Sequence, residues 1–101
     1  MLAPPTLQTT LTKRYSTAMQ WEEKDYYPDG GQKALYKEFK FKDFAEALTF
    51  VNKIGAIAEE LGHHPNITLM WGKVVVWTTS HDEHKITNKD HDLAKKIDQI
   101  S

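Results

Sequence analysis

The sequence feature that most constrains the fold is a helix whose two ends are both marked. Asp43 is a preferred N-cap residue, and Glu46 three positions later completes a capping-box pattern. Gly62 suits the left-handed residue that ends a helix, and Pro65 prevents its continuation. The apolar residues between these ends recur at helical spacing and are Phe44, Ala47, Leu48, Val51, Ile54, Ala58 and Leu61. The sequence therefore predicts an amphipathic helix ending at Gly62.

Strand patterns precede and follow this helix. Residues 34–41 alternate between apolar and polar side chains, although Lys37 interrupts the apolar face. Residues 67–71 and 74–80 predict two further strands, joined by a two-residue turn at Gly72-Lys73 with the glycine first. The stretch from Val74 to Trp77 is apolar on both faces, whereas an antiparallel strand with one covered face alternates. We therefore expect helices against one face of the sheet and another subunit against part of the other.

A second helix is predicted at the end of the chain. Thr87 and Asp90 form a short version of the capping pattern. The apolar residues that follow at helical spacing are Leu93, Ala94, Ile97 and Ile100. The order of strand, helix, strand, strand, helix indicates an α+β fold, with helices packed on an antiparallel sheet.

Length and composition limit the class of protein. A chain of 101 residues is long enough for one domain with a core of its own. It has no cysteine, which excludes disulfides and thiolate chemistry. The net charge of −1 gives no indication of nucleic acid or an anionic membrane as a partner, and no apolar run approaches the ~20 residues of a membrane span.

The N-terminal segment, residues 1–20, is predicted to lie outside the domain, which spans residues 21–101. It has no acidic residue, several Ser and Thr residues, and the basic pair Lys13-Arg14. This composition is typical of an organellar presequence, but Pro4-Pro5 opposes an early helix, so a flexible tail explains it equally well. We expect a cytoplasmic protein, with a mitochondrial location as the alternative.

Three histidines stand at the ends of predicted elements. His63 and His64 follow the end of the first helix, and His81 follows the last predicted strand. Glu59 lies on the final turn of the helix, and Asp90 opens the last helix. Imidazole can both donate and accept a proton near neutral pH, because its ordinary pKa is about 6.5. The pattern is therefore compatible with acid–base catalysis.

The same histidines have other interpretations. An adjacent pair in a small protein is more often a surface or structural feature than a site. A zinc site is disfavoured, because neighbouring histidines are poorly placed to bind one ion together and the helical i, i+4 spacing is absent. A serine triad is weaker still, because Ser80 and His81 are adjacent and do not present a hydroxyl to an imidazole.

The ordered set of these residues resembles the signature of the pterin-4a-carbinolamine dehydratases. Glu59 to Pro65 reads EELGHHP; Trp71 follows after five residues, His81 after nine more and Asp90 after eight more. The stretch from Phe39 to Phe44, FKFKDF, also resembles the junction of strand and helix in that family. The similarity extends from about Tyr36 to Ile100 and reverses the preference for a structural role of the histidines.

The resemblance implies a four-stranded antiparallel sheet with helices on one face, assembled as a homodimer or homotetramer. It implies dehydration of 4a-hydroxytetrahydropterin to quinonoid dihydropterin, in tetrahydrobiopterin recycling, with no metal and no organic cofactor. It assigns catalysis to His63, His64 and His81. The residues that it places around the pterin are Glu59, Gly62, Thr79, Ser80, Asp82, Asp90 and Trp21.

Two other functions remain open at this point. The family fold is also known as a dimerisation cofactor of a homeodomain transcription factor, which needs no catalytic histidines. A pterin-binding accessory protein with little dehydratase activity is the other alternative. The complete set of histidines favours the enzyme over both.

Overall fold

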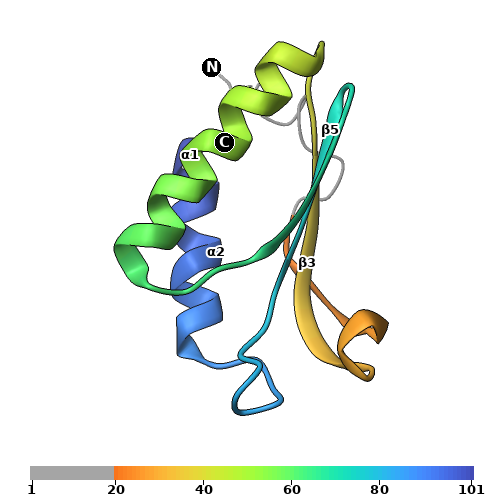
Figure 1. The fold of residues 1–101 in the computed structure, drawn as a ribbon, viewed down its shortest axis with the longest axis vertical. Helices are drawn as coiled ribbons and strands as arrows, with labels where there is room; N and C mark the ends of the chain where they lie inside the picture. Colours follow the sequence, from red (N-terminus) through yellow and green to blue (C-terminus); the bar gives the residue numbers. More distant parts are fainter. Residues whose placement is uncertain (1–19) are drawn as a thin grey trace, which may run out of the picture.

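The computed structural model describes residues 20–101, and within them an antiparallel sheet carries both helices on one face (Figure 1). The sheet has four strands in the order β2-β3-β5-β4. Its elements, in chain order, are β2 (Glu22–Tyr26), the 3-10 helix η2 (Tyr27–Asp29), β3 (Gln32–Lys40), α1 (Phe44–Leu61), β4 (Asn66–Met70), β5 (Lys73–Thr78) and α2 (Asn88–Ile100). The predicted α+β fold class is confirmed. The predicted N-terminal segment lies outside the described residues, except for Gln20.

Helix α1 begins and ends where its sequence signals predict. The Asp43 side chain accepts a hydrogen bond from the backbone N–H of Glu46 at 2.9 Å. The Glu46 carboxylate in turn accepts the backbone N–H of Lys42 at 3.2 Å, one residue before the cap. Gly62 has φ of +66°, a conformation that side chains other than glycine rarely adopt. The cap therefore turns the chain sharply toward β4, and the histidine pair follows at once.

The apolar stripe predicted for α1 was partly wrong. Phe44, Leu48 and Leu61 are 45%, 40% and 38% exposed, although the spacing placed them in the core. The buried residues of the helix are Ala47, Phe50, Ile54 and Ala58. The apolar surface of α1 is thus wider than the face that the sheet covers, and Phe50 belongs to the covered part.

The turn between β4 and β5 lies one residue earlier than predicted. Met70 pairs with Lys73, so the two loop residues are Trp71 and Gly72, and glycine comes second. A Cβ on Gly72 would stand 3.0 Å from the carbonyl oxygen of Phe41. The Gly72 carbonyl also accepts the backbone N–H of Phe41 at 2.8 Å. Glycine is required here by a close approach of two backbones, which the hairpin pattern alone does not reveal.

Lys37 has a partner inside the molecule, which explains its place on the apolar face of β3. Lys37 is 5% exposed, and its Nζ lies 2.9 Å from Oδ1 of Asp98 on α2. The same oxygen accepts the indole N–H of Trp21 at 3.1 Å. The ion pair therefore ties the middle of the sheet to the second helix, and Asp98 remains 43% exposed. The core itself is formed by Phe39, Ala47, Phe50, Ile54, Val74, Val76, Leu93 and Ile97.

The face of the sheet away from the helices carries an aromatic cluster. Trp77 lies with its ring centre 5.1 Å from that of Tyr26 and 4.7 Å from that of Tyr36. Lys24 stands over the Tyr36 ring at 4.2 Å. This arrangement explains why β5 is apolar on both faces. Strand β2, which supplies Tyr26 and Lys24, was not predicted from its own residues because it is a mostly charged edge strand.

Candidate active site

Asp90 connects the segments of the chain that carry most of the predicted site residues. Asp90 is fully buried, and its carboxylate accepts hydrogen bonds from the hydroxyls of Thr78 at 2.6 Å and Ser80 at 2.9 Å. The backbone N–H of Thr87 donates to it at 2.9 Å, completing the predicted capping box of α2. The fourth partner is Nε2 of His63 at 2.6 Å. One carboxylate thus joins the end of β5, the start of α2 and the segment after α1.

These bonds set the ionisation of Asp90. Burial by itself would raise the pKa of the carboxyl, but the hydrogen bonds from Thr78, His63, Thr87 and Ser80 outweigh burial and hold the pKa below its ordinary value. Asp90 is therefore a carboxylate at neutral pH and has only acceptor capacity. It follows that Nε2 of His63 is the donor in their bond, and Nδ1 is the acceptor of the neutral ring.

His64 and Glu59 form the second pair. Nε2 of His64 lies 2.5 Å from Oε2 of Glu59, which projects from the last turn of α1. The two side chains are 60% and 78% exposed. The sequence placed Glu59 on the final turn of the helix, and the structure shows that its partner is His64. Because this pair is open to solvent, it is less rigidly held than His63.

His81 and Asp29 form the third pair, and Asp29 was missed by the sequence analysis. Nδ1 of His81 lies 2.5 Å from Oδ2 of Asp29, which belongs to η2. The side chains are 52% and 34% exposed. The stretch from Pro28 to Gly31 reads PDGG, which is typical of a turn, and nothing in the sequence links a turn to a histidine 52 residues away.

The other residues predicted to surround the pterin differ in burial. Thr79 and Ser80 are buried, and the Thr79 hydroxyl donates to the backbone carbonyl of Lys33 at 2.8 Å. Gly62 and Asp82 are exposed beside the histidines, as their positions in the chain require. The side chains of Thr79 and Ser80 therefore bond within the framework of the site.

Trp21 is the predicted site residue that the structure does not bring to the histidines. Its indole bonds to Asp98, near the end of α2, whereas Asp90 is at the start of that helix. Eight residues of helix separate these positions by about 12 Å. Trp21 also packs edge-on against Phe39. In this structure it has a place in the core around Lys37.

The site lies at one end of the molecule, where several elements meet. The loop after β5, the start of α2 and the turn that contains η2 lie in the lower part of Figure 1, and α1 descends toward them on the left. The three histidine–carboxylate pairs come from these element ends. Rigid elements therefore position three separate imidazoles, each with its own carboxylate, along one edge.

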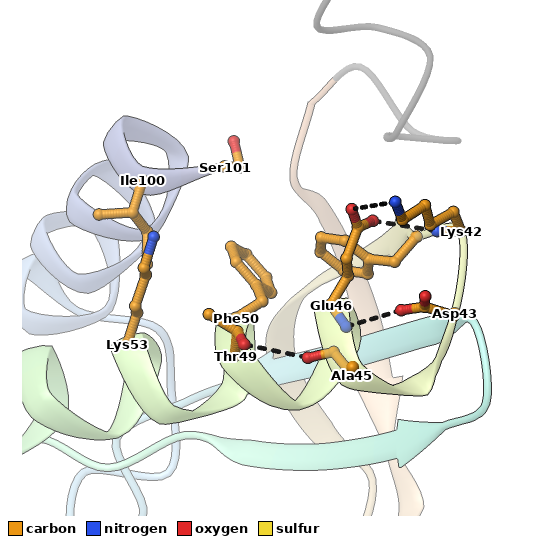
Figure 2. Close-up of a pocket in the computed structure, with 10 residues that line it drawn as sticks. Lys42, Asp43, Ala45, Glu46, Thr49, Phe50, Lys53, Ile100 and Ser101 are labelled. Atoms are coloured by element: carbon orange, nitrogen blue, oxygen red, sulfur yellow. Dashed lines mark hydrogen bonds and ion pairs between the residues drawn. The ribbon is translucent and has the colours of Figure 1, made fainter.

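A hollow on the described surface lies away from the histidines. It has a volume of about 500 Å³ and is lined by the first half of α1 and the end of α2, including Phe41, Glu46 and Lys53 (Figure 2). Glu46, one of its two acidic residues, is engaged with Lys42, as the dashed lines in Figure 2 show. None of the three histidines or their carboxylates lines this hollow.

No three His, Asp or Glu side chains within residues 20–101 are grouped so that they could hold one metal ion. No helix within the same residues is long and apolar enough to span a membrane. That the protein works without a metal or organic cofactor stays a prediction.

Comparison with known proteins places the chain in a family. The family model described as pterin 4 alpha carbinolamine dehydratase matches residues 3–100. A protein of Alkaliphilus metalliredigens named "Putative pterin-4-alpha-carbinolamine dehydratase" is 38% identical over 101 residues, covering 97% of this chain and 85% of that protein. A protein of Sulfurisphaera tokodaii with the same name is 47% identical over 66 residues, covering 65% of this chain and 71% of that protein.

Solved structures with the same fold agree. The crystal structure of a transcriptional coactivator/pterin dehydratase from Brucella melitensis superimposes with a TM-score of 0.72 at 29% identity, covering 95% of each chain. A pterin dehydratase-like protein identified as a RuBisCO assembly factor in the alpha-carboxysome gives a TM-score of 0.67 at 23% identity, covering 84% of this chain and 93% of that one, and shows the fold alone. The chain belongs to the pterin-4a-carbinolamine dehydratase family.

Proposed function

We propose that the protein dehydrates 4a-hydroxytetrahydropterin to quinonoid dihydropterin by histidine acid–base catalysis. The observation that carries the proposal is the set of three histidines, each bonded to a different carboxylate, at one end of the molecule. The family assignment supplies the substrate class. This activity belongs to the recycling of tetrahydropterin cofactors.

The reaction requires two proton transfers and no change of redox state. The 4a-hydroxyl is a poor leaving group until it is protonated, and it then departs as water. The proton on N5 leaves, and its bonding electrons form the new double bond to C4a. One imidazole can supply the first proton while another removes the second. A pair of histidines held apart by separate carboxylates suits this division.

We assign the two transfers to His63 and His81, and binding and orientation of the pterin to His64. His63 supports this assignment because its bond to buried Asp90 fixes the ring, with the side chain still 14% exposed. His81 is half exposed and has one ring nitrogen held by Asp29. His64 has the most exposed pair, which suits a residue that adjusts to a ligand.

Substitution of the histidines tests the proposal. We expect His63→Ala and His81→Ala each to lower kcat by about 10²–10⁴-fold, since that is the usual contribution of one general acid or base. The rate is measured by absorbance with chemically generated 4a-hydroxytetrahydropterin. His91→Ala is the matched control, because His91 is exposed on α2 and its side chain bonds to none of the three site carboxylates. Unchanged turnover in both site variants, with folding intact, would remove the histidines from the mechanism.

A binding role is the second candidate. The Brucella melitensis structure is described as a transcriptional coactivator as well as a pterin dehydratase. In this chain, Phe44 and Leu48 leave an apolar strip of α1 exposed, which a protein partner would cover. Replacing both by Ser separates the two functions, because neither residue is near the histidine pairs. Loss of a protein complex with dehydration unchanged would favour the binding role as an additional one.

A further inference from the structure

The turn between β2 and β3 contacts the loop that carries His81 at two places. Asp29 holds Nδ1 of His81 at 2.5 Å. Gln32, at the start of β3, donates from Nε2 to the Thr79 hydroxyl at 2.8 Å, and its Oε1 lies 3.2 Å from Nδ1 of His84. A segment some fifty residues earlier in the chain therefore clamps both sides of the tight turn that presents His81.

The clamped turn is conformationally unusual. His84 has φ of +57°, which makes it the one non-glycine residue of residues 20–101 in the left-handed region. Ser80 and Lys85 close the turn through a pair of backbone hydrogen bonds at 3.1 and 3.4 Å. A non-glycine residue persists in this region only when its surroundings hold it there. Gln32 is one of the groups that do so.

The opposing turn is also built for a fixed geometry. Gly30 and Gly31 both have positive φ, of +79° and +85°, so the chain reverses immediately after Asp29. The backbone N–H of Gly30 bonds to the Tyr27 carbonyl at 3.1 Å, and that of Gly31 to the Tyr26 carbonyl at 2.9 Å. Asp29 is therefore carried on a closed turn, and its carboxylate is presented to His81 by backbone geometry as well as by its own rotamer.

We propose that Asp29 is a positioning residue for His81 in the dehydration reaction. A carboxylate accepts and does not donate, so the Nδ1 atom of His81 carries the hydrogen and Nε2 is the nitrogen left for substrate. Asp29 thereby selects one tautomer and one ring orientation. The inference rests on the proposed function, and it adds a residue from a turn that no sequence motif marks as part of the site.

Removing the carboxylate of Asp29 separates this role from a structural one. We expect Asp29→Ala to lower kcat by about tenfold or more, well short of the ~10⁴-fold loss when a buried orienting carboxylate is neutralised, because this pair is partly exposed. KM is expected to stay within about twofold, since the orienting bond acts on proton transfer and not on pterin binding. Asp25→Ala is the matched control, because Asp25 is an exposed carboxylate of the same hairpin that pairs with Lys33 at 2.7 Å.

The tautomer itself is read by NMR. Long-range ¹H–¹⁵N correlation spectra of the full-length protein distinguish a protonated Nδ1 from a protonated Nε2, and the His81 signal is identified by its absence in His81→Ala. We expect the Nδ1–H form in the wild type and in Asp25→Ala, and a change toward the Nε2–H form in Asp29→Ala. An unchanged His81 tautomer in Asp29→Ala, or an unchanged kcat, would overturn the proposal.

The two measurements also separate this inference from the proposed function. If the wild type does not accelerate dehydration, the proposed function fails, and the tautomer comparison alone then decides whether Asp29 orients His81. A changed tautomer would support the positioning role and an unchanged one would contradict it. Melting curves of both alanine variants identify any loss of the fold.

Discussion

At the scale of single residues, the three carboxylates that bond to the site histidines differ in how deeply they are buried. Asp90 is enclosed and accepts four hydrogen bonds, whereas Glu59 and Asp29 meet their histidines at the surface. The buried carboxylate therefore serves the fold and the site together. The two exposed ones act chiefly on the orientation of their histidines, since surface pairs add little stability.

Asp90→Asn is expected to lower the free energy of unfolding at pH 7 by about 2–4 kcal/mol, because an amide brings its own hydrogens into a buried site that offers donors. The folded-state pKa of Asp90 lies below the ordinary value of 3.8, so its contribution is complete above that pH and is lost as the pH falls through the lower folded value. The stability difference between wild type and variant should therefore shrink below about pH 4.

Urea denaturation at pH 7 and at pH 3 measures this difference. Asp92→Asn is the control, because Asp92 is an exposed carboxylate two residues along the same helix. A difference between wild type and Asp90→Asn that is equal at both pH values would show that the ionised form of Asp90 contributes nothing to stability.

A site residue was predictable where the signal for it is local in the sequence. His63, His64 and Asp90 were identified because they lie at helix ends that the sequence marks by caps. Asp29 was missed because its contact with His81 depends on the pairing of β2 with β3, which places a distant turn under the site. Trp21 was assigned by resemblance, and its indole bonds instead at the far end of α2.

At the scale of elements, the ends of α1 decide where the site is. The Asp43 cap sets where the helix starts, and Gly62 sets where the chain leaves it. These signals are local, so they were readable from the sequence. The buried face of α1 and the register of the hairpin were not, because they depend on what packs against each element. Strand β2 was missed for the same reason: it is stabilised by β3, and its own sequence is mostly charged.

A pair of glycine substitutions in α1 tests the role of its C-terminal cap. Gly62→Ala should destabilise the protein by about 1 kcal/mol, because its φ of +66° is unfavourable for a residue with a Cβ. Gly55→Ala, in the helix interior with open space around the Cβ position, should stabilise by about 0.5–1 kcal/mol. Both are read from the urea midpoint. Stabilisation by Gly62→Ala would contradict the assigned cap.

At the scale of the whole molecule, the two faces of the sheet differ in what covers them. The helices cover one face, and the other carries the aromatic cluster of Tyr26, Tyr36 and Trp77 with Val75 beside it in β5. The aromatic rings cover one another only in part, since Tyr36 and Trp77 remain partly exposed. We expect a homodimer or homotetramer in which a second copy covers part of this face.

Light scattering after size exclusion measures the assembly directly. The expected mass is two or four times the 11.7 kDa of one chain. Trp77→Lys, which places a charge on that face without changing the core, should shift the mass toward the monomer. A wild type that is monomeric at working concentration would contradict the expectation, and the apolar residues of β5 would then be covered by their own neighbours alone.

One measurement tests most directly whether His63 and His81 catalyse dehydration. Chemically generated 4a-hydroxytetrahydropterin loses water slowly in buffer, and absorbance follows the formation of the quinonoid product. We predict that the purified wild-type protein accelerates this loss with saturation kinetics, and that the acceleration collapses in His63→Ala and His81→Ala but not in His91→Ala. A wild type no faster than buffer would contradict the account and leave the binding role in its place.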